Sequence, residues 1–472
     1  MQQDLILKRI NTIYFLAIIF LGIYFGKERA IFCDSSMQLF DMARTMTPSV
    51  NINMATTVVN FVLPYLAIII GLPLKIVVYL LVLNYLLIPI LVFFFLRYKQ
   101  QSVKYEMSFL IAFSIFNWQT FYYPIHDYWT GFYLLFVLYR VVDDASLSIK
   151  LKLKNRLVFV LIILIIFTHL SMLISLGFLL LYLLFEKAIS LKTIVKYYSF
   201  MMIVLVIKIL FINSGYQNSV IDINSFSWQN ISQVLTSKTI KEFLPTLFTT
   251  NLNFTLLAIF SGILFFFRKN KLSLLLLNIV FISSVFIIHF LFGSFGYSVY
   301  SEGYFKSTNI VIGIIFANVL IEVLTKKILI NLILSINFIF SVCVLFQGGL
   351  VFEKQYKFIN ESCKKFNRNV YLTSNKEICP LECLAVSRQS LIINQLENDN
   401  NAVIFSNIRN EHFVENLNVR WIEENKTKPV RYFNFSDDIT YLDADSMQFP
   451  IDSLSILFRD NKCDDLLKRL DQ

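Results

Sequence analysis

Long apolar runs separated by short polar linkers occupy the first three quarters of the chain. The runs are about 15 to 24 residues long, and a helix of about 20 apolar residues is long enough to cross a bilayer. The pattern therefore predicts an all-α polytopic membrane protein with about eleven transmembrane helices. The expected spans are residues 10–25, 74–96, 106–121, 128–142, 157–168, 170–185, 194–212, 252–267, 272–292, 304–323 and 328–346.

A further apolar stretch, Ala55 to Leu72, decides the orientation of everything after it. If this stretch does not span, the linkers on the amino-terminal side carry eighteen basic residues and the opposite linkers carry six. Basic residues accumulate on the cytoplasmic side of membrane proteins. We therefore interpret residues 55–72 as a helix in the outer interface, kinked at Pro64. This places the N-terminus in the cytoplasm, and the expected location of the protein is the cell inner (cytoplasmic) membrane.

The pattern changes after residue 346, where long apolar runs give way to short β-like segments. An odd number of spans leaves this part outside, so residues 347–472 are expected to form a small extracytoplasmic α/β domain beside the membrane domain, residues 1–346. The expected strands are residues 369–373, 402–405, 419–422, 431–435 and 455–458. Cys363, Cys379, Cys383 and Cys463 favour disulfides in an oxidising exterior, with a zinc site as the alternative.

Composition and charge exclude two classes of protein. Hydrophobic residues make up 56% of the chain and the mean hydropathy is +0.63, which excludes a soluble enzyme. The net charge of +10 divides into 26 basic and 13 acidic residues up to residue 346, and 16 basic and 19 acidic residues beyond it. The basic excess therefore lies in the linkers of the membrane half, where it sets topology. The expected surroundings are a lipid bilayer, with no nucleic-acid partner.

The stretch after the first span contains the first candidate chemistry. On a helix, Asp34, Gln38 and Asp41 fall within about 60° of one another, with Leu39, Met42, Ala43 and Met46 opposite. This pattern predicts an amphipathic helix on the membrane surface, within an outward interfacial segment at about 34–72. Only seven acids of the membrane half face outward, so Asp34 and Asp41 are catalytic candidates. Alternatively, Asp34 caps the helix and Asp41 is solvated.

Other outward ionisable residues complete the candidate list. Asp127 is a catalytic candidate, and an N-cap at the next helix is its alternative role. Substrate-binding candidates are His126, Glu302, Lys306, His289, Lys208 and Arg44. Glu302 and Lys306 end a loop rich in glycine and aromatic residues, which suits a sugar and a phosphate but is also typical of an ordinary interfacial loop. Lys208, like His169, is embedded in the membrane, where ionisable groups are often functional, although Lys208 is long enough to snorkel.

This layout resembles the polyprenyl-phosphate-dependent glycosyltransferases of the GT-C type, such as protein O-mannosyltransferases and aminoarabinose transferases. The shared features are an outward acidic segment directly after the first helix, a second interfacial helix from Val58 to Leu72, the Gly71-Leu72-Pro73 break, and a second outward acid at Asp127. The resemblance is one of topology and covers roughly residues 5–346. The adjacent acidic pair usual in the family is Asp34-Ser35 here.

The resemblance implies transfer of a sugar from a polyprenyl-phosphate donor to a glycan, lipid or protein acceptor at the outer face. Asp34, or alternatively Asp41, takes the place of the general base, and Asp127 that of the second-loop acid. Lys306 and Lys208 take the place of cations that neutralise the phosphate leaving group. No organic cofactor and no protein metal site is expected, and the need for a divalent metal stays open. Alternatives are a Wzy-type polysaccharide polymerase, a transporter and a non-enzymatic assembly protein.

Overall fold

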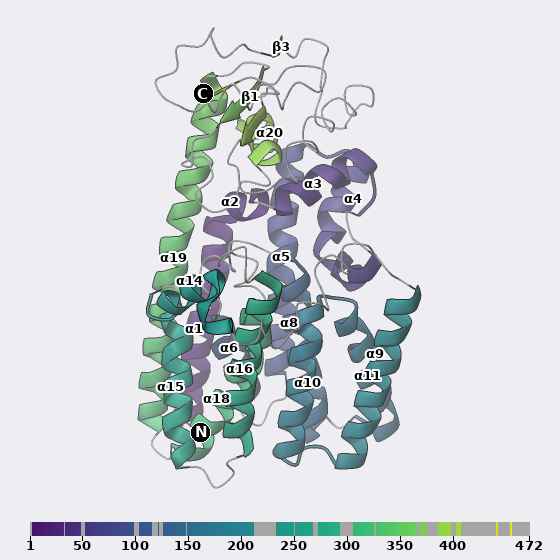
Figure 1. Ribbon diagram of the computed structural model, residues 1–472, viewed down its shortest axis with the longest axis vertical. Coiled ribbons are helices and arrows are strands. Elements are labelled where there is room, and N and C mark those ends of the chain that lie inside the picture. The colour runs from purple at the N-terminus through teal and green to yellow at the C-terminus, as the bar shows by residue number, and fades with distance from the viewer. Residues whose placement is uncertain are drawn as a thin grey trace. The chain divides into compact units, whose positions relative to one another are not determined.

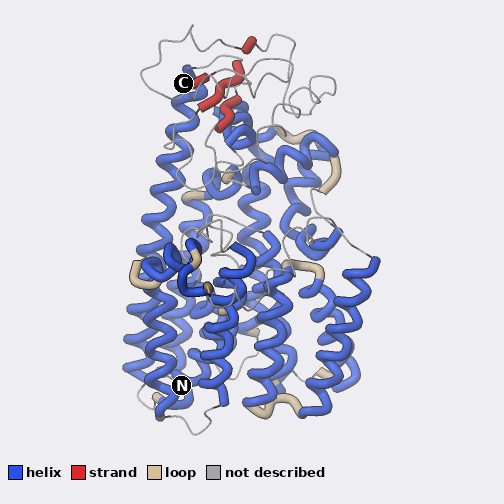
Figure 2. The backbone as a smooth tube through the Cα atoms, viewed as in Figure 1, coloured by secondary structure: helices blue, strands red, loops and turns tan. Residues whose placement is uncertain are grey.

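The computed structural model is predominantly helical (Figures 1 and 2). It describes residues 2–32, 34–48, 52–98, 103–115, 121, 126–147, 149–211, 233–249, 251–267, 272–292, 305–324, 327–365, 369–373, 386–397, 403–406, 440–441 and 454–455. The chain divides into two compact units. The first comprises Met1–Tyr24, Val50–Asn60 and Tyr85–Gln347, and the second comprises Phe25–Ser49, Phe61–Asn84 and Gly348–Gln472.

The first unit is a bundle of antiparallel helices. Its elements are α1 (Gln2–Tyr24), η1 (Ile52–Phe61), most of α5 (Leu74–Arg97), α6 (Lys104–Ile115), α8 (His126–Asp143), η2 (Ala145–Leu147), α9 (Leu151–Ile166), α10 (Leu170–Phe185), α11 (Leu191–Phe211), η4 (Val234–Thr236), α14 (Lys238–Thr246), α15 (Leu252–Phe266), α16 (Leu272–Phe292), α18 (Ile310–Val323) and the first half of α19 (Lys327–Lys365). We call the end where α1 begins the amino-terminal end, and the other the distal end.

Small residues and aromatic stacking hold the bundle together. Helices α6 and α18 approach so closely that a Cβ on Gly313 would lie 2.6 Å from the backbone nitrogen of Ala112. Close helix approach through small residues is the usual means of packing in a membrane, where apolar burial alone gives no drive. The rings of Tyr14 on α1 and Phe338 on α19 stack at 4.0 Å, and the Tyr14 hydroxyl lies 2.8 Å from Ser341 Oγ.

Helix length and surface chemistry make the chain a helical membrane protein. Among the described residues, four helical stretches are long and apolar enough to span: Leu5–Tyr24, Leu74–Arg97, Leu191–Phe211 and Ile328–Glu361. Shorter apolar helices include Ala55–Ile70, Ser171–Phe185 and Ile310–Val323. Apolar side chains such as Phe211, at 80% exposure, lie on the surface, where lipid is the compatible solvent.

The second unit contains short helices and a small sheet. Its helices are α2 (Gly26–Ile31), α3 (Asp34–Thr45), α4 (Val62–Ile70), the first part of α5, the last part of α19 and α20 (Val386–Glu397). The strands are β1 (Asn369–Thr373), β2 (Val403–Ser406), β3 (Thr440–Tyr441) and β4 (Leu454–Ser455). β1 pairs in parallel with β2 and β3 and antiparallel with β4. α20 therefore connects two parallel strands, and its residues from Gln389 to Asn394 are buried.

Two features differ from the sequence-based expectation. Residues 55–72 are not one helix kinked at Pro64: η1 gives way to α4 after Phe61, and Pro64 lies in the first turn of α4, where its missing N–H costs nothing. The expected end of this segment is correct, because Gly71 has φ 89° and caps α4. In addition, α19 continues to Lys365, nineteen residues past the expected end of the last span at 346. The expected strand at residues 369–373 coincides with β1.

Candidate functional site

Helix α3 of the second unit carries the first candidate acids. It begins at Asp34, and Leu39, Phe40, Met42 and Ala43 are at most 1% exposed, whereas Asp41 is half-buried. The expected amphipathic helix is therefore present, with its apolar side packed inward. Met46 departs from the expectation: it lies beyond the helix, with φ 56° and 38% exposure. Ser35 and Ser36 are also fully buried, so the first turn is more enclosed than the pattern indicated.

Arg44 lies in the last turn of α3. The helix ends at Thr45, whose hydroxyl donates to the Asp41 carbonyl oxygen at 2.7 Å. A basic residue in the last turn is favourable because it faces the negative end of the helix dipole. The backbone therefore places Arg44 near the carboxyl end of α3, and its role in substrate binding stays a prediction.

In the first unit, Lys306 caps a helix at the distal end of the bundle. Its Nζ donates to the carbonyl oxygen of Ile115, the last residue of α6, at 2.6 Å, and the side chain is 1% exposed. The ammonium also lies 5.7 Å from the centre of the Phe254 ring. The last carbonyls of a helix have no partner within it, and no water reaches them in a membrane. A buried ammonium at this position is thus stabilised by the helix that it caps.

Two amide side chains complete the end of α6. Asn253 Nδ2 donates to the carbonyl oxygen of Ser114 at 2.6 Å, and Asn337 Nδ2 donates to the Ser114 hydroxyl at 2.9 Å. These residues come from α15 and α19, so three distant segments converge on one helix end. The sequence contained no signal for this group, because neutral asparagines in apolar helices do not stand out by charge or spacing.

Lys208 has the same role at the end of α9. Its Nζ donates to the Ile166 carbonyl oxygen at 2.8 Å and lies 5.4 Å from the Phe167 ring centre. The side chain is only 3% exposed, so Lys208 does not snorkel outward but stays among helices. Its charge and that of Lys306 are both held at the distal end of the bundle.

His169 lies beside Lys208, in the turn between α9 and α10. Its Nδ1 accepts from the backbone N–H of Ser171 at 3.3 Å, so the imidazole caps the start of α10. The imidazole ring also packs against the Tyr128 ring, with centres 4.3 Å apart. Tyr128 is in the first turn of α8, and this contact brings the start of α8 to the His169 turn.

The start of α8 positions two further candidates. His126 and Asp127 are its first two residues, so Asp127 lies within the first turn and is not the N-cap. A carboxylate in a first turn is favoured by the positive end of the helix dipole. The backbone therefore places Asp127 at the distal end of the first unit, on the same helix end as Tyr128.

Segment η1 packs over this group. Thr56 Oγ1 donates to the Leu164 carbonyl oxygen at 2.8 Å, and the Thr56 backbone N–H donates to the Phe167 carbonyl oxygen at 3.2 Å. Asn60 Nδ2 donates to the Thr130 hydroxyl at 2.8 Å. The part of the expected interfacial helix that belongs to the first unit is thus fixed against α8 and α9.

The candidate residues are divided between the two units. His289 is buried near the end of α16, 5.3 Å from the Phe290 ring between ring centres, and Glu302 lies outside the described residues. The distal end of the first unit therefore holds the starting turn of α8, His169, Lys208, Lys306 and His289. The second unit holds Asp34, Asp41 and Arg44.

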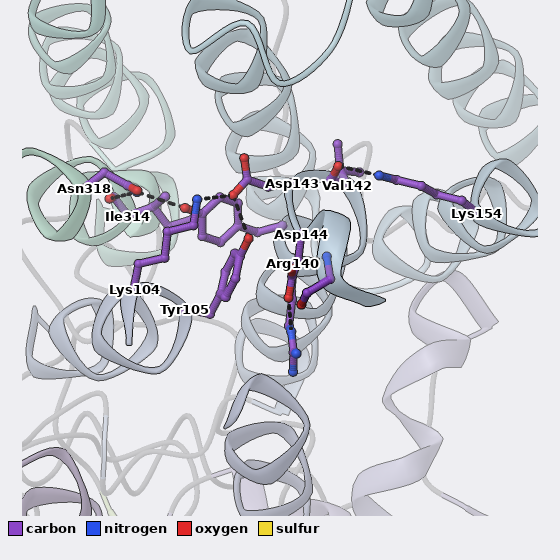
Figure 3. Close-up of polar contacts among 11 residues, drawn as sticks. Lys104, Tyr105, Arg140, Val142, Asp143, Asp144, Lys154, Ile314 and Asn318 are labelled. Atoms are coloured by element: carbon purple, nitrogen blue, oxygen red, sulfur yellow. Dashed lines mark hydrogen bonds and ion pairs between the residues drawn. The ribbon is translucent and has the colours of Figure 1, made fainter. Parts of the chain in front are cut away.

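Acids at the amino-terminal end have structural partners. Tyr105 donates to Asp143 at 2.9 Å, Lys104 forms an ion pair with the same carboxylate, and Arg140 Nε lies 3.1 Å from Asp144 Oδ2 (Figure 3). The buried Arg140 guanidinium also donates to the carbonyl oxygens of Phe95 and Tyr98 at the end of α5. Burial raises the pKa of Asp144, but hydrogen bonds from Ser146 and Arg140 outweigh it and lower that pKa overall.

Glu106 is a buried acid that the sequence analysis did not single out. Its side chain is fully buried in α6, where Oε1 accepts from Asn11 Nδ2 at 3.1 Å and Oε2 lies 3.5 Å from Arg97 Nε. Arg97 also donates to Thr12 Oγ1 at 2.7 Å. This network joins α1, α5 and α6. The sequence signal that could have identified Glu106 is a lone acid in the first turn of an apolar helix.

Two further comparisons concern metal binding and similarity to known proteins. Within the described ranges, no three His, Cys, Asp or Glu residues form a group that could hold a metal ion. Cys379, Cys383 and Cys463 lie outside those ranges. No protein-family model, curated protein or solved structure matches the chain.

Proposed function

We propose that this membrane protein is a glycosyltransferase that moves a sugar from a polyprenyl-phosphate donor to a glycan, lipid or protein acceptor at the outer face. In this proposal eleven spans cross the inner membrane, the N-terminus is cytoplasmic, and the residues after α19 form an extracytoplasmic α/β domain. The observation that carries the proposal is helix α3: it follows α1 and α2 in the chain, begins at Asp34, and carries the half-buried Asp41 together with a fully buried apolar side.

The chemistry requires few groups. The acceptor hydroxyl oxygen bonds to the anomeric carbon of the sugar, the bond from that carbon to the phosphate oxygen breaks, and polyprenyl phosphate leaves with the electron pair. Asp34 takes the hydroxyl proton as general base, and Asp41 is the alternative. A phosphate-linked sugar is already activated, so alignment, one base and charge stabilisation suffice.

Charge at the distal end of the first unit suits an anionic leaving group. Lys208 and Lys306 are both buried there, and each ammonium donates a hydrogen bond to a backbone carbonyl at a helix end. In a medium of low dielectric the charge of an ammonium acts over a longer range than in water. We assign these two lysines to neutralising the lipid phosphate, and His126, Asp127, His289 and Glu302 to contacts with the sugar or acceptor.

Distribution of the acids also favours this assignment. At the amino-terminal end, Glu106, Asp143 and Asp144 are occupied in contacts that join helices. The proposal therefore takes its reacting carboxylates from α3 and from the start of α8.

Product analysis tests the reaction class. The purified protein in lipid nanodiscs is incubated with a panel of radiolabelled polyprenyl-phosphate sugars and a membrane extract as the acceptor source. We expect polyprenyl phosphate to be released in proportion to sugar added to the acceptor. A transporter would move the lipid without releasing polyprenyl phosphate, and a polymerase would yield long glycans instead of single additions; either result would reject the proposal.

A further inference from the structure

The second unit contains a small cavity whose lining includes none of the residues assigned to sugar transfer. It has a volume of about 20 Å³, which is space for one water-sized group. Its walls come from α2, Phe32 directly after it, the last part of α19, and α20. Figure 1 labels these three helices. The lining residues are Glu28, Ile31, Phe32, Phe352, Gln355, Tyr356, Ile359, Gln389 and Ile393.

Gln389 is the polar residue in the cavity wall that indicates a ligand. Its side chain is 2% exposed, and among the described residues neither Oε1 nor Nε2 has a hydrogen-bond partner. Buried amides are almost always hydrogen-bonded, because their desolvation is otherwise uncompensated. One acceptor and one donor on the same side chain match a hydroxyl group, which both donates and accepts.

Glu28 adds a second acceptor at the cavity wall. Burial raises the pKa of this carboxyl, and the nearby Glu353 carboxylate raises it further. A hydroxyl that donates to Glu28 would compensate part of that burial, whereas a bound anion would worsen it. The cavity therefore favours a neutral ligand rich in hydroxyls over a phosphate or a carboxylate.

Aromatic and aliphatic side chains form the rest of the wall. The rings of Phe32 and Phe352 meet edge to face, with centres 4.3 Å apart and planes at 84°. Ile31, Ile359 and Ile393 surround them. Such a surface suits the C–H face of a sugar ring, whose hydroxyls would reach the polar groups while the ring stays at the rim.

We propose that this cavity is a subsite that binds a hydroxyl group of a glycan. The choice of a glycan among hydroxyl-bearing ligands rests on the proposed function, in which it is the acceptor. The cavity lies against α20, which connects the parallel strands β1 and β2, so glycan binding there would position the acceptor on the second unit.

Saturation-transfer NMR on the full chain in nanodiscs tests this subsite. The probes are the methyl glycosides of glucose, galactose, mannose and N-acetylglucosamine. We expect at least one to bind, and Gln389→Leu to weaken that binding at least tenfold while the thermal midpoint stays unchanged or rises. Gln395→Leu, on the same helix but outside the cavity, is the matched control and should bind as the unaltered chain does.

A second variant guards against a folding defect. Glu28→Gln preserves the volume but removes the charged acceptor, and it should also weaken binding. Absence of binding by all four probes, or equal binding by Gln389→Leu and the unaltered chain, would overturn the proposal and leave an ordered water only. Release of polyprenyl phosphate is measured in parallel: release without probe binding rejects the subsite alone, and probe binding without release rejects the transferase alone.

Discussion

Lys306 Nζ donates to the carbonyl oxygen of Ile115 at 2.6 Å, across 191 residues of sequence. The same relationship recurs between Lys208 and Ile166, between Lys154 and Val142 at 2.8 Å, and between Arg140 and the end of α5. In each case a cation is bound to the carbonyl end of a neighbouring helix. Two effects favour this arrangement in a membrane. The last carbonyls of a helix have no partner within the helix and no water to bind, and the carbonyl end of the helix carries a partial negative charge.

Removal of the Lys306 ammonium should destabilise the bundle. Lys306→Met leaves the Ile115 carbonyl buried without this donor, and a hydrogen bond to a charged group contributes about 1.5 to 3 kcal/mol. We expect a lower unfolding midpoint in detergent titrations followed by circular dichroism. Lys192→Met, at an exposed position on α11, is the matched control. Equal midpoints for both variants would contradict the capping role.

The Arg97–Glu106 pair should show strong coupling. Glu106 is fully buried, so Arg97→Met strands a carboxylate and should cost about 3 to 5 kcal/mol. The double variant Arg97→Met/Glu106→Gln removes the stranded charge and should recover much of that loss. A double-mutant cycle on the unfolding free energy measures the coupling. Additive single effects would show that the pair does not join α5 to α6.

Gly313 should not tolerate a methyl group. A Cβ there meets the Ala112 backbone at 2.6 Å, and overpacking of this kind costs about 1 to 3 kcal/mol. Gly262 on α15 has no atom within 4 Å of the equivalent position, so Gly262→Ala is the control and should be neutral or slightly stabilising. Thermal midpoints of the two variants decide the point, and a tolerated Gly313→Ala would mean that α6 and α18 lie farther apart.

The contact of α20 with α2 and the last part of α19 should depend on pH. Tyr356 donates to Glu397 at 2.7 Å and Lys27 lies 3.1 Å from it. The Tyr356 hydrogen bond lowers the pKa of Glu397 against burial, with Lys27 assisting. Burial alone would lower the pKa of Lys27, but its hydrogen bond to Glu397 and the charge of that carboxylate raise it overall.

The sign follows from these two shifts. A lowered Glu397 pKa contributes stability that is present above about pH 4.5 and is lost as the pH falls through the folded value. A raised Lys27 pKa contributes stability below about pH 10.5 that is lost as the pH rises through its folded value. The hydrogen-exchange protection of α20 should therefore be greatest between these limits. Lys27→Met should flatten the profile by up to about 1 kcal/mol, and an unchanged profile would contradict the contact.

The local pattern of apolar and polar residues was sufficient to predict much of the fold. The apolar runs located α10, α15 and α16 to within one residue, and Gly71 with Pro73 marked the break before α5. The polar stripe of α3 was visible from Gln38 and Asp41. These features depend on neighbours in sequence, through helical period or backbone conformation.

Remote partners were not predictable in this way. Lys306 stood out as a base that ends an outward loop and Lys208 as an embedded cation, but their carbonyl partners lie 191 and 42 residues away and carry no sequence signal. The pattern predicted one helix kinked at Pro64, whereas η1 gives way to α4 after Phe61. A proline is conspicuous in a sequence, but a change of helix type is not. Gln389 was missed, since an unpartnered amide is recognisable only when the surrounding helices are in place.

Single-turnover sugar transfer by Asp34→Asn tests the central claim most directly. The variant keeps the side-chain volume but removes the base, and general-base catalysis contributes about 10² to 10⁴ in rate. We predict a fall of that size in polyprenyl phosphate release, with donor binding and membrane insertion unchanged. Glu242→Gln, an exposed acid on α14, should react at the unaltered rate. A rate for Asp34→Asn within a few-fold of the unaltered chain would contradict the account.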